Sequence, residues 1–246
     1  MPVFAANLET LWTELHPMDR PAAAARAGFE WVEIPFPYDL NAADLRKELI
    51  RLGLRLALMA CPPPNYTGGA PGFAAVPGAE GRFRRDLARA LRYAELLRPR
   101  VLQILPGEAG GARGILVENL SWAATRAGSQ RLVIEPARGQ AALADFDDAT
   151  AILREIGAPN LLLLFDAAHA HALTGDAAAA WAAYGPRTGH VQFADAPGRG
   201  APGTGEVDLP AFFAAVEASG HEGPLGAEYH PGGATEATLA WFAPPA

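Results

Sequence analysis

A short apolar segment that ends in a carboxylate constrains the fold more than any other part of the sequence. In residues 131–136, RLVIEP, three consecutive apolar residues run directly into Glu135 and Pro136. A continuous apolar run suits a strand that is buried on both faces, as in a parallel sheet. Pro136 has no backbone N–H to donate, so the strand should end there. Glu135 is therefore expected at the carboxyl end of a buried parallel strand, where α/β sheets and barrels bind their ligands.

The same pattern returns three more times further along the chain. An apolar or alternating segment carries a polar oxygen at or near its carboxyl end at Asp166, Gln192 and Glu228. The intervals between these positions are close to the roughly 30 residues that one strand–helix unit of a parallel barrel occupies. One oxygen ligand therefore appears on each of four successive units.

The length and the alternation of segments predict an α/β fold, a (β/α)8 TIM barrel formed as a single domain by residues 1–246. The chain has 246 residues, and about 250 are typical of such barrels. We expect strands at 3–6, 31–34, 54–59, 101–105, 131–135, 161–165, 190–194 and 224–227. We expect helices from Asp19 to Gly28 and at 42–52, 80–97, 115–126, 144–156, 172–183, 207–218 and 235–242. The Pro/Gly-rich stretch 61–78 is too long for a plain connector and is typical of a functional lid.

Composition narrows the function classes. The formal net charge of −7 disfavours nucleic-acid binding, and no apolar run approaches the length of a membrane span. Lys47 is the only lysine and lies in a polar helix, which disfavours Schiff-base aldolases and pyridoxal enzymes. No signal peptide is evident and Cys61 is the only cysteine, so we predict a cytoplasmic protein. The expected partner is a small-molecule substrate, and a homo-oligomer is left open.

The four recurring oxygens predict a single divalent-metal site formed by Glu135, Asp166, Gln192 and Glu228. Carboxylate and amide oxygens suit Mg²⁺ or Mn²⁺ best, with Zn²⁺ and Co²⁺ as further options. Three converging carboxylates would raise one another's pKa values without a cation. A bound dication would also polarise a substrate carbonyl, while two glutamates moved protons between neighbouring carbons. Each residue alone has a plainer interpretation, as a helix cap or an arginine partner.

Neighbouring residues are candidates for substrate binding. Asn7 ends the first strand, His169 follows Asp166 by three positions, and Arg199 lies in a Gly/Pro-rich loop where it could bind a carboxylate. Glu206 ends that loop and either orders it, caps the next helix or meets the substrate. Two further histidines are interpreted from position: His190 points the same way as Gln192 and is a ligand or a packing residue, while His221 is interpreted as structural.

Several segments together resemble the hydroxypyruvate isomerase family of xylose-isomerase-like TIM barrels. The resemblance runs over nearly the whole chain and is most specific at HVQFADAPGRGAPGTGEVD (190–208). The other segments are AANL (5–8), FPYD (36–39), LVENL (116–120), VIEP (133–136), FDAAH (165–169) and GAEYHP (226–231).

The resemblance implies a metal held by Glu135, Asp166, Gln192 and Glu228, with Glu135 and Glu228 as the acid/base pair. It also matches His169, Arg199 and Glu206 to residues of the family's site. The implied activity is an aldose–ketose type isomerisation of a small 2-keto acid or sugar, first of all hydroxypyruvate to tartronate semialdehyde.

Two departures from the family pattern keep alternatives open. Met59 stands where relatives commonly carry a histidine, and Ala137 where they carry an asparagine. A sugar 3-epimerase or dehydratase of the same barrel superfamily, or a non-catalytic ligand-binding barrel, is therefore weighed beside the isomerase. The endonuclease branch is disfavoured because it uses a histidine-rich zinc cluster, and this acidic chain has only 6 His.

Overall fold

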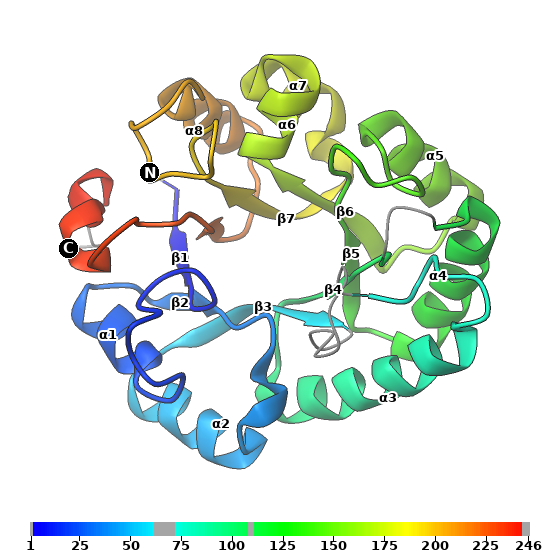
Figure 1. Cartoon of the computed structure of the whole chain (residues 1–246), viewed down its shortest axis with the longest axis horizontal. Coiled ribbons are helices and arrows are strands. Elements are labelled where there is room, and N and C mark those ends of the chain that lie inside the picture. Colours follow the sequence, from blue (N-terminus) through cyan, green and yellow to red (C-terminus); the bar gives the residue numbers. More distant parts are fainter. Residues whose placement is uncertain (1, 62–71, 108–110, 243–246) are drawn as a thin grey trace.

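A closed barrel of eight parallel strands forms the centre of the molecule in a computed structural model that describes residues 2–61, 72–107 and 111–242. Each strand pairs with the next along the chain, and β8 pairs with β1 to close the sheet (Figure 1). The strands are β1 (Phe4–Asn7), β2 (Trp31–Glu33), β3 (Arg55–Cys61), β4 (Val101–Ile104), β5 (Arg131–Ile134), β6 (Leu161–Asp166), β7 (Thr188–Phe193) and β8 (Leu225–Ala227). The predicted TIM barrel is confirmed.

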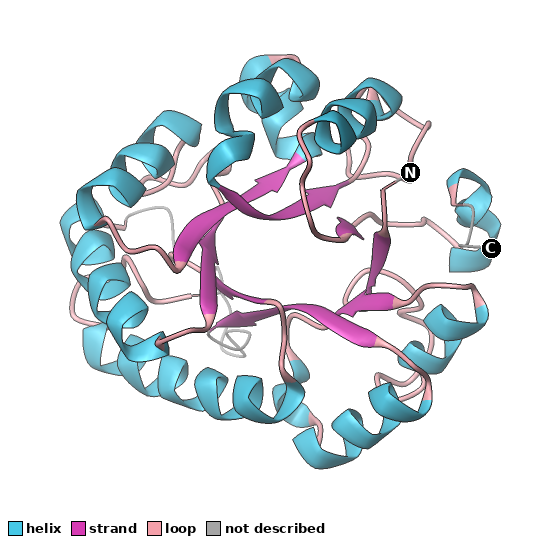
Figure 2. Cartoon of the chain, turned by 180° about the vertical axis from the view of Figure 1, so that it is seen from behind, coloured by secondary structure: helices cyan, strands magenta, loops and turns pink. Residues whose placement is uncertain are grey.

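Helices surround the barrel on its outside (Figure 2). They are α1 (Arg20–Arg26), α2 (Ala42–Arg51), α3 (Glu80–Leu97), α4 (Arg113–Ala127), α5 (Phe146–Ile156), α6 (Ala167–Thr174), α7 (Ala177–Tyr184) and α8 (Leu209–Ala218). Three 3-10 segments, η1 (Pro37–Asp39), η2 (Gly185–Arg187) and η3 (Thr235–Trp241), complete the described elements. None of the described helices combines the length and the apolar character that a membrane crossing requires.

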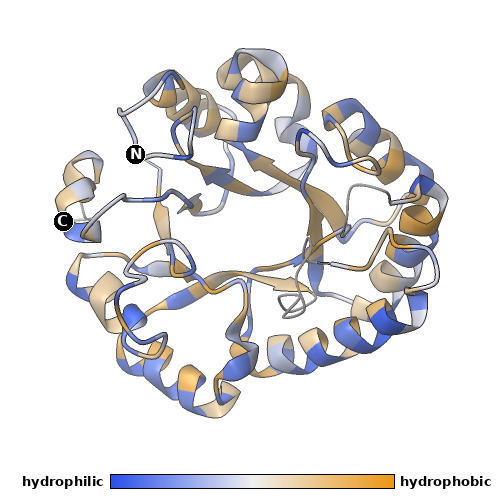
Figure 3. Cartoon of the chain, viewed as in Figure 1, coloured by the Kyte–Doolittle hydropathy of each residue, from blue (hydrophilic) through white to orange (hydrophobic). Residues whose placement is uncertain are grey.

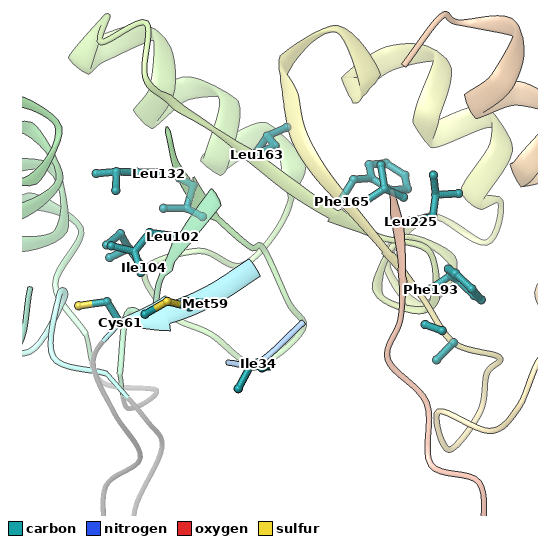
Figure 4. Close-up of a cluster of buried hydrophobic side chains, with 14 of the residues drawn as sticks. Ile34, Met59, Cys61, Leu102, Ile104, Leu132, Leu163, Phe165, Phe193 and Leu225 are labelled. Atoms are coloured by element: carbon teal, nitrogen blue, oxygen red, sulfur yellow. The ribbon is translucent and has the colours of Figure 1, made fainter. Parts of the chain in front are cut away.

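The core has two parts because each strand is buried on both faces. The larger part fills the space between barrel and helices, and Figure 4 shows side chains of this part that come from several strands. A separate small cluster combines one residue from each of four adjacent strands, Leu58, Val101, Val133 and Leu164. Figure 3 shows the apolar strands surrounded by helices with polar outer sides. Successive side chains of a strand point to opposite faces. Val133 and Glu135, and likewise Leu164 and Asp166, therefore share the inner face of the barrel.

The predicted helix 172–183 is wrong in its bounds, since two short helices occupy this region. The Asp166 side chain accepts a hydrogen bond from the His169 N–H at 2.8 Å and so begins α6. Gly175 ends α6 in a left-handed conformation with φ 84°. Asp176 then begins α7 by accepting from the Ala179 N–H. An aspartate before each helix and a glycine between them therefore override the continuous alanine-rich pattern.

The closing helix predicted at 235–242 is a 3-10 segment, η3, which lies between α1 and α8 in the outer ring (Figure 1). The Thr238 hydroxyl donates to the Thr235 carbonyl at 2.7 Å, the type of side-chain bond that competes with α-helical bonding. Aromatic contacts hold the segment: Phe242 stacks on Phe29 with ring centroids 4.0 Å apart. The segment thus fills the position of the eighth barrel helix by packing rather than by helix length.

Candidate active site

Three carboxylates converge at the carboxyl end of the barrel. Asp166 is the last residue of β6, Glu135 follows β5 and Glu228 follows β8. The side chains of Asp166, Glu135 and Glu228 are 0%, 16% and 25% exposed. Gln192 lies beside Asp166 in the pairing of β6 with β7. The four residues that the sequence grouped by spacing alone are therefore neighbours at one end of the barrel.

Arg199 supplies a cation among these carboxylates. Its Nη2 lies 2.9 Å from Asp166 Oδ2 and 2.6 Å from Glu228 Oε2. The same nitrogen donates to the Glu228 carbonyl at 3.0 Å. The Arg199 backbone has a left-handed φ of 55°, and its carbonyl accepts from the His230 N–H at 2.7 Å. The loop therefore holds the guanidinium against the strand ends.

His169 and Gln103 flank Glu135 on its two sides. Gln103 Nε2, from β4, donates to Glu135 Oε2 at 2.7 Å. His169 Nε2 lies 3.5 Å from Glu135 Oε1 and 3.4 Å from Arg199 Nη1. Gln103 is a site residue that sequence reasoning missed, although an amide inside the apolar strand VLQI was a visible signal.

A second polar cluster lies inside the barrel around Glu33 on β2. The Glu33 carboxylate is fully buried and accepts from Asn7 Nδ2 at 2.8 Å and Gln192 Nε2 at 2.8 Å. His190 Nε2 lies 2.5 Å from its other oxygen. Sequence reasoning missed Glu33. The signal was the same as for Gln192, because a polar side chain within a buried strand requires polar partners.

Gly226 on β8 makes room for this buried carboxylate. A Cβ added at Gly226 would overlap the Glu33 carboxylate. Position 226 is also the pairing partner of Gln192 in β7. The glycine in the segment GAEYHP is therefore required by a side chain that comes from another strand of the barrel.

Asn7 connects the two clusters, since its Nδ2 also lies 3.3 Å from Glu228 Oε1. Its Oδ1 accepts from the Glu9 N–H at 2.9 Å, which fixes the amide orientation. Asn7, predicted as a substrate-binding residue, is fully buried beside the carboxylates.

The comparisons with known proteins give the family. The model of the xylose isomerase-like TIM barrel family matches residues 21–244. The chain belongs to this family. A 2-oxo-tetronate isomerase of Cupriavidus necator is 39% identical, covering 99% of this chain and 98% of the relative. A hydroxypyruvate isomerase of Escherichia coli K12 is 33% identical, covering 98% of each. The resemblance inferred from motifs is confirmed.

Solved structures agree with this family membership. The crystal structure of an AP endonuclease, family 2, from Brucella melitensis superposes with a TM-score of 0.94 at 34% identity over 99% of both chains. A D-allulose 3-epimerase from Methylomonas sp. superposes with a TM-score of 0.76 at 22% identity, covering 92% of this chain and 83% of that one. The latter likeness shows the fold alone.

The donor set fits a hard cation of the kind that the family resemblance implies. Glu135 Oε1 and Gln192 Oε1 are buried and accept no hydrogen bond from the described residues. Buried polar atoms without partners are uncommon and call for a ligand. In the described ranges, no three His, Cys, Asp or Glu side chains lie in a group that could hold a metal ion, and Arg199 lies between Asp166 and Glu228. Carboxylate oxygens of the kind that a hard cation binds are nevertheless present together at the carboxyl end of the barrel.

Burial and mutual repulsion separate the acidities of the three carboxyl groups. Burial raises the pKa of Glu228 well above its usual range, and the neighbouring carboxylates raise it further against the effect of Arg199. Burial likewise raises the pKa of Glu135. Burial would also raise the pKa of Asp166, but Arg199 and His169 outweigh it, so that the Asp166 pKa is lowered. The site therefore holds two proton-accepting glutamates beside one firmly ionised aspartate.

Glu206 does not meet the other site residues in the described part of the chain. Its side chain is exposed, and only its backbone N–H bonds the loop, to the Ala196 carbonyl at 2.7 Å. The expectation that it caps the next helix is wrong, since Asp208 caps α8 by accepting from the Ala211 N–H. Asp195 orders the loop instead, by accepting from the N–H groups of Gly203 and Val207. A role of Glu206 in substrate binding stays a prediction.

The predicted lid at 61–78 falls mostly on residues 62–71, which lie outside the described part of the chain. Of the remainder, the Ala74 carbonyl accepts from Asn119 Nδ2 of α4 at 2.8 Å. Met59, which replaces the commonly found histidine, is fully buried in the core. Ala137 is also buried.

Proposed function

We propose that this isomerase interconverts a short 2-keto acid that carries a neighbouring hydroxyl group with its isomer, with Mg²⁺ or Mn²⁺ bound by Glu135, Asp166, Gln192 and Glu228. Hydroxypyruvate to tartronate semialdehyde is the first candidate reaction. The name of the Cupriavidus relative makes the four-carbon acid 2-oxo-tetronate the second. The observation that carries the proposal is the convergence of three carboxylates at Arg199 and His169, where the buried Glu135 Oε1 accepts no hydrogen bond from the described residues, beside Gln192, whose buried Oε1 also accepts none.

The chain's own residues supply the proton transfers. A bound dication would polarise the substrate carbonyl and make the neighbouring C–H more acidic. For hydroxypyruvate, one of Glu135 and Glu228 removes a proton from the hydroxymethyl carbon. The other delivers a proton to the former carbonyl carbon, while the proton of the hydroxymethyl oxygen passes to the former carbonyl oxygen, so that the first carbon becomes the aldehyde and the second bears the hydroxyl group. Burial raises the pKa of both glutamates in the metal-free protein, which favours proton acceptance by their carboxylates.

Arg199 would bind the substrate carboxylate. Its guanidinium now neutralises Asp166 and Glu228, a role that a dication would take over. The planar fork can then form two parallel hydrogen bonds with a carboxylate. A site that keeps an arginine for this purpose favours acids over neutral sugars.

The net charge and the donor set favour a keto-acid isomerase over an endonuclease, the activity for which the Brucella structure is named. The chain carries a net charge of −7, whereas binding to a phosphate backbone requires a basic surface. The central donors here are carboxylate and amide oxygens, to which His169 contributes only at the edge.

The test is an assay of protein stripped with a chelator and then reconstituted separately with Mg²⁺, Mn²⁺, Co²⁺ or Zn²⁺. Substrates are hydroxypyruvate, 2-oxo-tetronate and a panel of C4–C6 ketoses. Turnover of a keto acid that depends on added metal supports the proposal, and the ratio of the two acids identifies the substrate. Turnover of ketoses alone would support an epimerase. Metal binding without any turnover would support a non-catalytic barrel.

A further inference from the structure

We infer that Glu33 is a positioning residue that fixes which atom of Gln192 faces the cation site. The inference rests on the proposed function, since it assigns the residue that prepares one of the proposed ligands. Glu33 lies on β2, whereas the proposed ligands lie on or after β5, β6, β7 and β8.

The first step is that Glu33 is surrounded by donors. Asn7 Nδ2 and Gln192 Nε2 donate to one carboxylate oxygen, and His190 Nε2 lies 2.5 Å from the other. The amide NH₂ groups of Asn7 and Gln192 both point at Glu33 Oε2, so this oxygen is a hydrogen-bond acceptor for two donors.

The second step concerns the orientation of the Gln192 amide. Because Glu33 Oε2 is the acceptor in this contact, Gln192 turns its NH₂ group toward Glu33. Its Oε1 then faces the other way, where it is buried and without a hydrogen-bond partner in the described chain. The reversed amide would bring oxygen against a carboxylate oxygen at about the present 2.8 Å separation. Glu33 therefore holds the Gln192 amide in the orientation that leaves Oε1 free to bind a cation.

The third step is that Glu33 reaches both sides of the site. Asn7, held by Glu33 at 2.8 Å, also contacts Glu228 Oε1 at 3.3 Å. Gly226 leaves the space that the carboxylate occupies. One buried group thus orients an amide ligand directly and a carboxylate ligand through Asn7, whereas a simple packing role would need none of these bonds.

The experiment measures Mn²⁺ affinity by titration calorimetry on the metal-free protein, for wild type, Glu33→Gln, Gln192→Glu and the double exchange. Glu33→Gln should weaken Mn²⁺ binding by about 10- to 100-fold, because the amide of Gln192 is no longer held. Gln192→Glu should also weaken it, although a carboxylate is ordinarily the better ligand, because two carboxylates then face each other. The double exchange restores a donor–acceptor pair and should recover part of the affinity.

The outcomes separate this inference from the proposed function. Equal affinity of wild type and Glu33→Gln, or tighter binding by Gln192→Glu, would overturn the inference alone. Absence of Mn²⁺ binding by wild type would overturn the proposed function and the inference together. Circular dichroism of each metal-free variant checks folding, and if Glu33→Gln does not fold, Gln192→Glu still decides, because a structural role alone predicts no loss of affinity there.

Discussion

Glu33 and Glu228 are carboxyl groups of one barrel, the first fully buried and the second partly buried, and their surroundings differ in kind. Glu33 has partners from the chain at both oxygens, the amides of Asn7 and Gln192 at one and His190 at the other. Glu228 also has a partner near each oxygen, Asn7 and Arg199, but it lies among other carboxylates and its pKa is strongly raised. The first arrangement is part of the barrel interior, while the second provides negative charge that a bound cation can neutralise. The contrast teaches that burial alone does not mark a functional carboxylate; a raised pKa caused by burial among other carboxylates does.

The largest expected effect comes from Glu228→Gln, which keeps the shape and removes the proton acceptor. We expect turnover to fall by about 10²- to 10⁴-fold, the usual contribution of a general base. Loss of a repelled carboxylate should also raise the melting temperature of the metal-free protein. Steady-state kinetics and thermal unfolding measure both, with Glu118→Gln on the exposed face of α4 as the control. Unchanged turnover would remove Glu228 from the chemistry.

The opposite stability response is expected at Glu33. Glu33→Ala leaves the buried amide donors of Asn7 and Gln192 without this acceptor, and each buried donor left unsatisfied costs about 1–3 kcal/mol. Glu228→Ala in metal-free protein should be neutral or stabilising. Urea unfolding of both variants at neutral pH compares them directly. Equal losses in the two variants would show that the contrast between the two groups is not energetic.

The carboxylates at the end of the barrel could be predicted from the sequence, but the role of Glu33 inside the barrel could not. Glu135, Asp166 and Glu228 each stand where an apolar run ends, so strand topology alone brings them together. Glu33 ends β2 but is followed by the apolar Ile34, so no apolar run stops at it, and its partners come from β1 and β7, which the local sequence does not reveal.

Local chemistry also limits what the sequence could show about the elements. The helix α3 was predicted at its observed bounds because its apolar stripe repeats over many residues. The break between α6 and α7 rests on Gly175 and Asp176, two residues in an alanine-rich stretch whose periodicity conceals them. Gln103 was missed because its hydrogen-bond partner, Glu135, follows a different strand, and the local sequence does not reveal that contact.

A smaller effect is expected from Arg199→Lys, which keeps the positive charge but loses the planar fork. A lysine ammonium cannot bind two acceptors in parallel, so the KM for a keto acid should rise by about 10- to 100-fold. The KM for any ketose that is turned over should change much less, since a neutral sugar has no carboxylate. Kinetics on both substrate classes measure this, with the exposed Arg187→Lys as the control. An equal change in KM for both substrate classes would show that Arg199 serves only the protein carboxylates Asp166 and Glu228.

The smallest expected effect is a pH dependence of stability from His221, which extends the comparison to a half-buried group that precedes β8, whereas Glu228 follows it. Burial, and then the neighbouring His190 and Arg100, lower the pKa of His221 to about 4. In the unfolded chain a histidine has a pKa of about 6.5. Between these values the unfolded state binds a proton that the folded state does not. The free energy of unfolding should therefore fall as pH drops from about 6.5 toward 4.

The variant His221→Asn removes the titrating imidazole, so its free energy of unfolding should depend less on pH. At pH 7 the histidine is neutral in both states, so any difference there reflects packing against Trp181 rather than titration. Urea unfolding at pH 7, 6 and 5 should show wild type losing more stability than the variant on acidification. The raised pKa values of Glu135 and Glu228 act in the opposite direction, but both proteins share them and they cancel in the difference. Parallel curves for the two proteins would show that His221 is protonated in the folded barrel, and the His171→Asn variant on α6 controls for loss of an unrelated histidine.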